Sequence, residues 1–398
     1  MKKLKVMTVV GTRPEIIRLS RVIALLDKYV HHLLVHTGQN YDYELNEIFF
    51  DDLGLRKPDY FMNTDTSSLG SAIGDIFKRT EEILNKEQPD AFLVLGDTNS
   101  CLSAYMAKRK HIPIFHMEAG NRSFDFNVPE EINRRIIDHI ADFNLVYTEH
   151  ARRHLLSEGL PHRRIYLTGS PMWEVLRQNM EKIKQSDILH SLKLKAKGYF
   201  IVSVHREENV DNEENLKKIL NILDELAEQY KIPIIVSTHP RTRKRIEELV
   251  TKDKRQDEID ANDQPPVTSR SSLISFLTPF GFTDYIHLQM NALCTISDSG
   301  TISEESAILS FPAISLRNSM ERPEAQDAGT IVLTGFDKDV VLDAVKLSIE
   351  EHKSGGYKQL PFEYQIENTS WRVVKLILGN AGLSNDWWGI KQNVAEKT

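Results

Sequence analysis

Three acidic residues of the chain are placed for proton transfer. Asp97 and Glu118 each follow a short apolar run that predicts a strand, and Glu130 lies in the first turn of a helix predicted to begin at Pro129. The carboxyl ends of neighbouring parallel strands meet at one edge of a sheet, so these carboxylates could face one ligand. A cluster of carboxylates suits a reaction that moves protons on and off carbon and oxygen. Helix capping explains Glu130 or Glu131 equally well, and each acid can also be a cap or loop residue.

A second group of residues suits a phosphate. Arg13 follows the first predicted strand, and Pro14 beside it favours the first turn of a helix, whose N-terminus attracts anions. His205 and Arg206 follow a predicted strand of the second half and could meet phosphate oxygens. An ordinary turn with a surface arginine also explains Arg13, and a lone histidine is often an incidental core or surface residue.

Small residues after a later strand extend the predicted phosphate site. Ser299, Gly300 and Thr301 lead into a helix, so backbone amides there could bind a diphosphate. Glu305, one turn inside that helix, could bind ribose hydroxyls, and Arg322 presents a further guanidinium. A capping serine with no ligand is the alternative explanation for this turn.

Other candidate sites are weaker. His239 and Arg241 repeat the histidine and arginine pattern one strand later and are second-rank candidates. The turn at Gly11 lacks the GxGxxG fingerprint, so a nicotinamide cofactor is not indicated. The chain has no paired Cys-x-x-Cys spacing, and we expect neither a metal nor a cofactor.

The elements that must position these residues follow an alternating pattern. Short β-branched apolar runs alternate with segments of 3.6-residue periodicity, which predicts parallel strands joined by crossover helices and an α/β fold. The predicted strands are residues 4–10, 32–36, 91–95, 112–116, 143–147, 165–168, 199–204, 232–237, 293–297, 312–316 and 330–333. The clearest predicted helices are residues 69–84, 213–230 and about 368–378.

A polar, lysine-rich stretch at residues 182–197 indicates a domain boundary nearby. We expect a first doubly wound domain at residues 1–171, completed by a C-terminal helix at about 367–398, and a second at residues 172–366. Residues 251–270 are predicted to form an exposed loop. Two such domains would face each other and bind their ligand in the cleft, at the carboxyl ends of the strands.

Composition limits the class of protein. The 398 residues allow two or three domains, and the net charge of -7 argues against nucleic acid as a partner. The only cysteines, Cys101 and Cys294, lie in apolar segments, which favours reduced thiols in the cytoplasm. No apolar stretch approaches the roughly 20 residues of a membrane span, and no signal-peptide core follows the first residues.

The motifs GTRPE, LGDT, HMEAG, PEEINR, VHREEN, SDSGT and ERPEA occur in this order over nearly the whole chain. Together they resemble the non-hydrolysing UDP-N-acetylglucosamine 2-epimerase family. The resemblance implies two Rossmann-like domains in the glycosyltransferase-B arrangement, a homodimer, and inversion at C2 of a UDP-linked N-acetylhexosamine. The reaction would proceed by anti elimination of UDP to a 2-acetamidoglycal and re-addition.

The resemblance also implies roles for residues. Asp97, Glu118 and Glu130 match the catalytic acids, and His205 matches a catalytic or phosphate-contacting group. Tyr285 falls where the family places an aromatic ring against uracil, and Arg18 stands where many members have lysine. The implied UDP-sugar-binding residues are Arg13, Arg18, Arg134, Arg206, Tyr285, Ser299, Gly300, Thr301, Glu305 and Arg322.

Departures from the common motifs bear on the substrate. Where common members have EAGLR, HRRE and SGG, this chain has EAGNR at 118–122, HREE at 205–208 and SGT at 299–301. These features, with TGSPM at 168–172 and TGQNYDYE at 37–44, resemble the branch that makes UDP-N-acetyl-L-fucosamine from UDP-2-acetamido-2,6-dideoxy-L-talose for capsule or O-antigen synthesis.

Other activities fit the same sequence. UDP-N-acetylglucosamine to UDP-N-acetylmannosamine epimerisation is the main alternative substrate pair. A UDP-sugar-dependent glycosyltransferase of the same fold, a hydrolysing epimerase and a non-catalytic nucleotide-sugar sensor are the others. An acceptor requirement would distinguish the transferase, and stoichiometric free UDP would distinguish the hydrolysing enzyme.

Overall fold

In the computed structural model, the apolar runs of the first half form a parallel sheet that carries the acidic residues. The strand order is β3-β2-β1-β4-β5-β6-β7. Because β1 pairs with both β2 and β4, the winding direction reverses there, as in a doubly wound fold. The strands are β1 Lys5–Val10, β2 His31–His36, β3 Tyr60–Phe61, β4 Ala91–Leu95, β5 Ile114–Ala119, β6 Phe143–Val146 and β7 Ile165–Leu167.

The structure describes residues 3–38, 50, 52–238, 242–246, 248–249, 271–356 and 359–390. The chain divides into a first unit, Met1–Asn179 with Phe362–Thr398, and a second unit, Met180–Pro361. The first boundary falls inside the continuous helix α7 (Met172–Lys184), whereas the sequence pattern places it before that helix. His239, Arg241, residues 251–270 and most of residues 37–44 lie outside the described residues.

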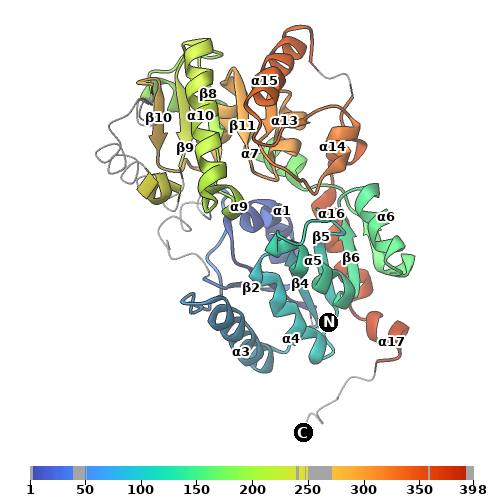
Figure 1. The fold of residues 1–398 in the computed structure, drawn as a ribbon. Helices are drawn as coiled ribbons and strands as arrows, with labels where there is room; N and C mark the ends of the chain where they lie inside the picture. Colours follow the sequence, from blue (N-terminus) through green and yellow to red (C-terminus); the bar gives the residue numbers. More distant parts are fainter. Residues whose placement is uncertain are drawn as a thin grey trace. The chain divides into compact units, whose positions relative to one another are not determined.

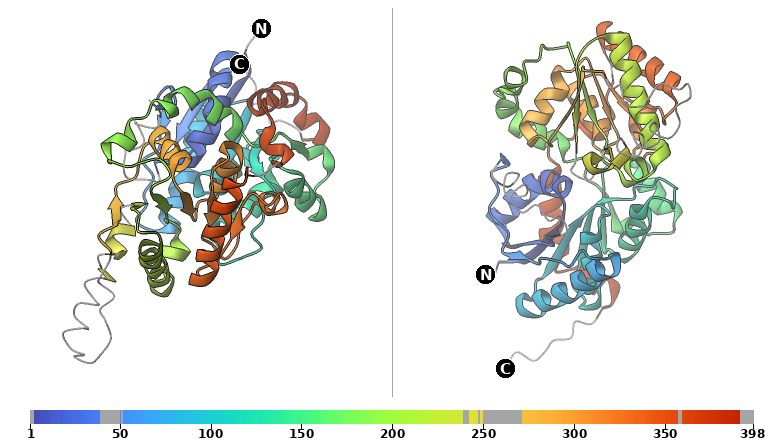
Figure 2. Two further views of the ribbon diagram at one scale, coloured as in Figure 1. Left: turned by 90° about the horizontal axis from the view of Figure 1, so that it is seen from above. Right: turned by 60° about the vertical axis from the view of Figure 1, so that its left-hand side comes forward.

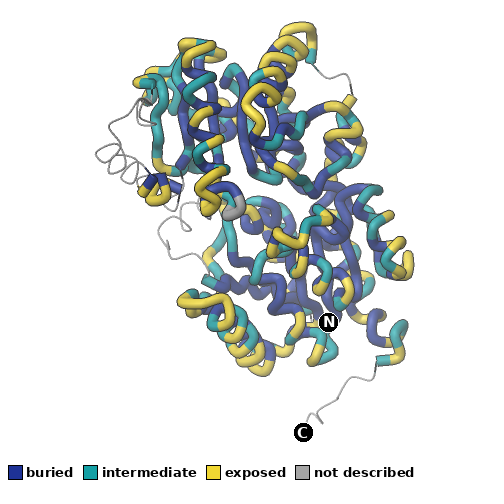
Figure 3. The backbone as a smooth tube through the Cα atoms, in the orientation of Figure 1, coloured by how far each residue is buried: buried dark blue, intermediate teal, exposed yellow. Residues whose placement is uncertain are grey.

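Helices cover both faces of the first sheet, which explains why its strands are apolar on both sides. α1 (Arg13–Tyr29) and α16 (Thr369–Asn380) pack on one face, and α3 (Leu69–Glu87), α4 (Ala104–Arg109) and α5 (Pro129–Ile140) pack on the other (Figure 1). Figure 3 shows the strands as buried and the outer surface of α3 as largely exposed. The remaining helices of this unit are η1 Asn99–Ser103, α6 Glu149–Ser157, η2 His162–Arg164, η3 Phe362–Gln365 and α17 Ser384–Trp388.

The second unit repeats the doubly wound plan, with the strand order β10-β9-β8-β11-β12-β13. Its strands are β8 Phe200–Ser203, β9 Ile234–Ser237, β10 Ile274–Leu277, β11 Cys294–Ser297, β12 Ala313–Ser315 and β13 Val332–Leu333. α10 (Glu213–Tyr230) and α15 (Lys338–Lys353) pack on one face, and α8 (Ile188–Ser191) and α12 (Phe282–Asn291) pack on the other (Figure 2). Its shorter helices are α9 Glu207–Val210, α13 Ile302–Leu309 and α14 Pro323–Asp327.

The predicted fold class is confirmed, because both units are doubly wound parallel sheets covered by helices. The sequence pattern does not predict β3, which has two residues, or β10, which is only partly buried. β5 runs to Ala119, so Glu118 lies within the strand and not after it. Leu69, the apolar first residue of α3, is exposed.

The end of β5 is irregular at Glu118. The register with β6 shifts between Met117 and Ala119, and Glu118 has a left-handed backbone with a φ of 64°. Gly120 follows with a φ of 81°, and a Cβ there would lie 2.5 Å from the Ala151 carbonyl oxygen. Both the conformation and the space therefore require glycine at this position.

A Gly120→Ala variant should be less stable than the parent. The loss in unfolding free energy should exceed the part that comes from placing alanine in a left-handed backbone conformation. Gly159 is the matched control, since its φ is 87° and no atom lies within 4 Å of the position that a Cβ would take. Each alanine should lose about 1–2 kcal/mol from backbone strain, and crowding at Gly120 should add about 1–3 kcal/mol. Equal losses for both variants in denaturant unfolding would contradict the steric account.

Glu15 lies in the first turn of α1, where it is buried and links separate segments. Its carboxylate accepts hydrogen bonds from Gly11 N at 2.6 Å, from Ser100 Oγ at 2.9 Å and from Thr98 Oγ1. Burial raises the pKa of Glu15 to about 7, and the hydrogen bonds from Thr98, Gly11 and Ser100 lower it only in part. Glu15 thus ties the turn after β1 to the turn that carries Asp97.

A Glu15→Gln variant should gain stability relative to the parent as pH rises from about 5 to 8. The folded-state pKa of Glu15 exceeds the unfolded value, so the parent loses stability as pH rises from the ordinary glutamate pKa of 4.5 to about 7. The loss is at most about 3 kcal/mol, and glutamine cannot ionise. The difference in unfolding free energy between the two proteins, measured at several pH values, should change within this window and should be flat above it. A difference that does not vary with pH would show that Glu15 ionises normally.

Candidate active site

Asp97 follows β4 and is held by a buried arginine of α5. Arg134 directs Nε and Nη2 to the Asp97 Oδ2 atom, at 3.0 and 2.5 Å. The Asp97 backbone oxygen also accepts a hydrogen bond from Asn133 Nδ2 at 2.9 Å. The Asp97 side chain retains 20% of its exposure, so a carboxylate with fixed orientation remains accessible at the end of the strand.

Glu118 has an arginine partner of its own. Arg18 Nη1, from α1, forms an ion pair with Glu118 Oε2, and both side chains are buried. Asn121 Nδ2 donates a weak hydrogen bond to the other oxygen, Oε1, at 3.4 Å. The guanidinium offsets the free energy needed to bury the Glu118 charge. Arg18 therefore contacts a predicted catalytic acid directly.

The structure separates the two glutamates that begin α5. Glu131 is fully buried and accepts hydrogen bonds from Ser123 N at 3.0 Å, Arg134 Nη1 at 3.0 Å and Arg135 Nε at 3.0 Å. Glu130 lies partly exposed in the first turn. Glu131 is therefore committed to internal ion pairs, which leaves Glu130 as the glutamate of this pair that is open to solvent.

In the second unit, His205 and Arg206 follow β8 beside a buried carboxylate. Asp298 accepts hydrogen bonds from the backbone N of His205 and of Arg206, each at 3.0 Å, and lies 3.2 Å from His205 Nδ1. Burial raises the pKa of Asp298, but the charge and hydrogen bond of His205 and the bonds from Arg206 N and Asn209 outweigh it and bring the pKa to about 2. Because Nδ1 faces the carboxylate, His205 can offer Nε2 to a ligand.

The predicted diphosphate turn lies next to Arg206. Arg206 Nε donates to the Asp298 backbone oxygen at 2.9 Å, and a Cβ on Gly300 would lie 3.7 Å from Arg206 Nη2. Ser299 Oγ lies 3.0 Å from Thr301 Oγ1 and accepts a hydrogen bond from Thr301 N at 3.3 Å. The turn therefore presents hydroxyls and a guanidinium together, which suits phosphate oxygens.

The other predicted residues of the second unit have defined partners. Arg322 Nη1 lies 3.0 Å from Glu304 Oε1, and both residues are buried. Glu305, in α13, accepts a hydrogen bond from Gln289 Nε2 at 2.9 Å. Tyr285 packs partly buried against the core, and burial with the nearby Glu305 charge raises the pKa of its hydroxyl.

The structure brings together Asp97 with Arg134 and Glu118 with Arg18 in the first unit, and the residues around Asp298 in the second. Arg13 begins α1, partly exposed. The sequence pattern does not single out Asp298, although this residue directly precedes the predicted diphosphate turn. Nor does it identify Arg317, which makes a two-fold ion pair with Glu321 at 2.8 and 2.9 Å.

The described residues contain no group of three or more His, Cys, Asp or Glu side chains arranged to hold a metal ion. Cys101 and Cys294 are free thiols and are buried. Within the part of the chain that the structure describes, no helix has the length and apolar character needed to cross a membrane.

The chain is similar to one family of known proteins in both sequence and structure. Residues 25–378 match the model of the family described as UDP-N-acetylglucosamine 2-epimerase. The solved structure of UDP-N-acetylglucosamine 2-epimerase from Rickettsia bellii is 49% identical with a TM-score of 0.88, covering 98% of this chain and 100% of that one. The Methanocaldococcus jannaschii UDP-GlcNAc 2-epimerase, solved with UDP-GlcNAc and UDP, is 34% identical with a TM-score of 0.84, covering 94% and 100%.

A third relative acts on a different sugar. The UDP-2,3-diacetamido-2,3-dideoxy-D-glucuronate 2-epimerase of Pseudomonas aeruginosa is 30% identical over 349 residues, covering 87% of this chain and 92% of the relative. The family match spans residues 25–378, which is most of the chain and takes in parts of both doubly wound units. The chain therefore belongs to the UDP-N-acetylglucosamine 2-epimerase family and is an isomerase that acts on a UDP-sugar.

Proposed function

We propose that the protein converts UDP-2-acetamido-2,6-dideoxy-L-talose to UDP-N-acetyl-L-fucosamine, a precursor for surface polysaccharide. The observation that carries this choice is the position of Asn121, which replaces the leucine of common family members. Its amide lies 3.4 Å from Glu118, a proposed catalytic acid. A change in polarity next to that acid supports a sugar other than N-acetylglucosamine. UDP-N-acetylglucosamine remains the alternative substrate.

The proposed chemistry follows from the position of the C2 hydrogen. It is adjacent to no carbonyl group, so its removal alone would leave an unstabilised carbanion. If the bond between C1 and oxygen breaks as the proton leaves, the electron pair of the C2–H bond forms the C1–C2 double bond. UDP then departs with the pair of the C1–O bond, and a neutral 2-acetamidoglycal results. Return of UDP to C1 with a proton on the opposite face of C2 gives the epimer.

We assign the acids of the first unit to C2. One of Asp97, Glu118 and Glu130 takes the proton, another delivers a proton to the opposite face, and the third positions the sugar or balances charge. The ion pairs with Arg134 and Arg18 support this assignment, because they orient two of the carboxylates. General acid–base groups of this kind contribute roughly 10²–10⁴-fold to a rate.

We assign the basic residues to the UDP group. Arg13, His205 and Arg322 would stabilise the charge that grows on the departing diphosphate. Arg206, Ser299, Gly300 and Thr301 would hold its oxygens, with support from the contacts around Asp298. The remaining residues of the proposed UDP-sugar site are Tyr285 at uracil, Glu305 at ribose, and Arg18 and Arg134 beside the acids.

Purified protein in deuterated buffer should incorporate deuterium at C2 of UDP-2-acetamido-2,6-dideoxy-L-talose and form UDP-N-acetyl-L-fucosamine without an acceptor, as followed by proton NMR. Asp97→Asn should slow this exchange by roughly 10²–10⁴-fold, whereas Asp187→Asn, at an exposed position, should not. Exchange confined to UDP-N-acetylglucosamine would overturn the substrate. Stoichiometric free UDP would indicate a hydrolysing enzyme, and exchange at the parent rate in Asp97→Asn would remove Asp97 from the acid–base groups.

We also propose that the protein is a homodimer that associates through α4 and α5. Tyr105, Ile132 and Ile136 are exposed large side chains on these neighbouring helices, and Phe126 lies just before α5. Ile132 and Ile136 are four residues apart, so they share one face of α5. Exposed apolar side chains that gather on one face favour a protein partner.

An Ile136→Glu variant should be monomeric where the parent is dimeric, because a charge at the interface loses its hydration on association. Leu347→Glu, at an exposed position of α15, is the matched control and should leave the mass unchanged. Light scattering after size exclusion gives the masses. A monomeric parent, or a dimer that survives Ile136→Glu, would contradict this assignment of the interface.

A further inference from the structure

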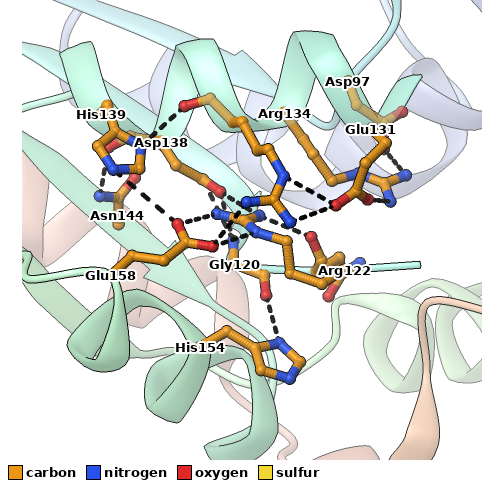
Figure 4. A network of polar contacts seen from close by, with 12 residues as sticks. Asp97, Gly120, Arg122, Glu131, Arg134, Asp138, His139, Asn144, His154 and Glu158 are labelled. Atoms are coloured by element: carbon orange, nitrogen blue, oxygen red, sulfur yellow. Dashed lines mark hydrogen bonds and ion pairs between the residues drawn. The ribbon is translucent and has the colours of Figure 1, made fainter. Parts of the chain in front are cut away.

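Asp138 is a fully buried carboxylate of α5 that lies beside Gly120 and Arg122 (Figure 4). Gly120 N donates to both of its oxygens at 3.2 Å. Arg122 Nη1 donates to Oδ2 at 2.7 Å, and His116 Nδ1 lies 3.0 Å from Oδ1. No motif of the sequence assigns a role to Asp138, and the proposed chemistry does not use it.

One of these contacts leads to the turn that carries Asp97. The second ring nitrogen of His116, Nε2, lies 2.8 Å from the carbonyl oxygen of Gly96. A carbonyl oxygen only accepts hydrogen bonds, so Nε2 is the donor. Gly96 directly precedes Asp97 and has a left-handed φ of 71°. Asp138 therefore fixes, through His116, the backbone from which the Asp97 side chain extends.

Another contact leads to Glu118. Gly120 lies two residues after Glu118, and both have left-handed backbones. The hydrogen bonds from Gly120 N to Asp138 hold this turn, and Glu118 must keep its unusual backbone for its side chain to reach Arg18. Backbone strain of this kind persists only where surrounding contacts determine it. Asp138 supplies such a contact.

A third path runs from Asp138 through side chains back to Asp97. Arg122 pairs with Glu158 through two hydrogen bonds, of 2.8 and 2.6 Å. Glu158 also pairs with Arg135, at 3.3 Å. The path ends in contacts already described, from Arg135 to Glu131, from Glu131 to Arg134 and from Arg134 to Asp97. Figure 4 shows these ion pairs as one continuous network.

The environment of Asp138 favours a permanent charge. Burial raises the pKa of Asp138, but the hydrogen bond and charge of His116 and the charge and hydrogen bond of Arg122 outweigh it, and the pKa is lowered. A carboxylate that stays ionised keeps all of its contacts over the working pH range. It can therefore hold the two turns in one arrangement.

We propose that Asp138 is a positioning residue for the epimerisation, which sets the backbone under both Asp97 and Glu118 without contacting the substrate. This inference rests on the proposed function, because it assumes that these two acids act at C2. In this view the buried side chain of Asp138 keeps Asp97 and Glu118, which come from neighbouring strands, aligned with each other.

The test is Asp138→Asn in the full chain. Asparagine keeps the size but loses the negative charge that pairs with Arg122, and only one of its two terminal atoms accepts hydrogen bonds. We expect kcat for epimerisation and the rate of C2 deuterium exchange to fall on the order of 10–100-fold, as for supporting residues of other sites. KM for the UDP-sugar should change less than about 3-fold, because the basic residues of the second unit hold UDP.

Asp142→Asn is the matched control. Asp142 is also a buried aspartate of the first unit, and it accepts hydrogen bonds from Lys108 Nζ at 2.5 Å and Ile114 N at 2.9 Å, at the start of β5. Its loss should lower stability and leave kcat within about 3-fold of the parent. The inference is overturned if Asp138→Asn keeps the parent kcat, or if both variants lose kcat equally.

If Asp138→Asn does not fold, His116→Gln decides with the same readouts, because it breaks the path to Gly96 and leaves the Gly120 contact. A fall in kcat at unchanged KM supports the inference, and parent kinetics overturn it. A parent protein that exchanges no C2 hydrogen in either UDP-sugar would instead show that the proposed function has failed. The two failures are therefore distinguishable.

Discussion

The arrangement of acidic residues in the first unit depends on the free energy needed to remove a carboxylate from water. A buried ion without a partner is destabilised by several kcal/mol, and arginine is suited to pair with it because its planar guanidinium matches the carboxylate. Asp97, Glu118 and Asp138 each lie against a different arginine, namely Arg134, Arg18 and Arg122. The pairing allows several acids to lie at one edge of a sheet, which the proposed chemistry at C2 requires.

The second unit uses the same constraint for a different purpose. Asp298 is buried at the end of β11, and the groups that stabilise its charge are backbone amides and a histidine. The acid therefore fixes the backbone of His205 and Arg206, and it leaves His205 Nε2 on the side of the ring away from the carboxylate. In both units a buried carboxylate orients the residues at the end of a strand. The carboxylates proposed to act at C2 come from the first unit, whereas the basic residues proposed to hold UDP come from both units, namely Arg13 from the first and His205 and Arg322 from the second.

The sequence was sufficient for the fold class because β-branched runs and helical stripes are local patterns, and α10 begins and ends as predicted. It could also place Asp97 at the end of its strand. The helix pattern alone could not separate Glu130 from Glu131, since both suit a helix N-terminus, and only the resemblance singled out Glu130. In the structure, Arg134 and Arg135 donate to Glu131. The sequence pattern did not indicate that Asp138 is buried, because a charged residue within an amphipathic helix usually faces solvent. The burial of Asp138 depends on His116 and Arg122, which come from other segments.

The central claim is that C2 is inverted only when the bond between C1 and oxygen opens. The most direct measurement uses UDP-sugar with ¹⁸O in the bridge between C1 and the β-phosphorus, followed by phosphorus NMR. The account predicts that most product molecules carry the label in a non-bridging position, because any terminal oxygen of the released β-phosphate can return to C1 once rotation has made these oxygens equivalent. Deuterium entering C2 while the ¹⁸O stays in the bridge would contradict the account.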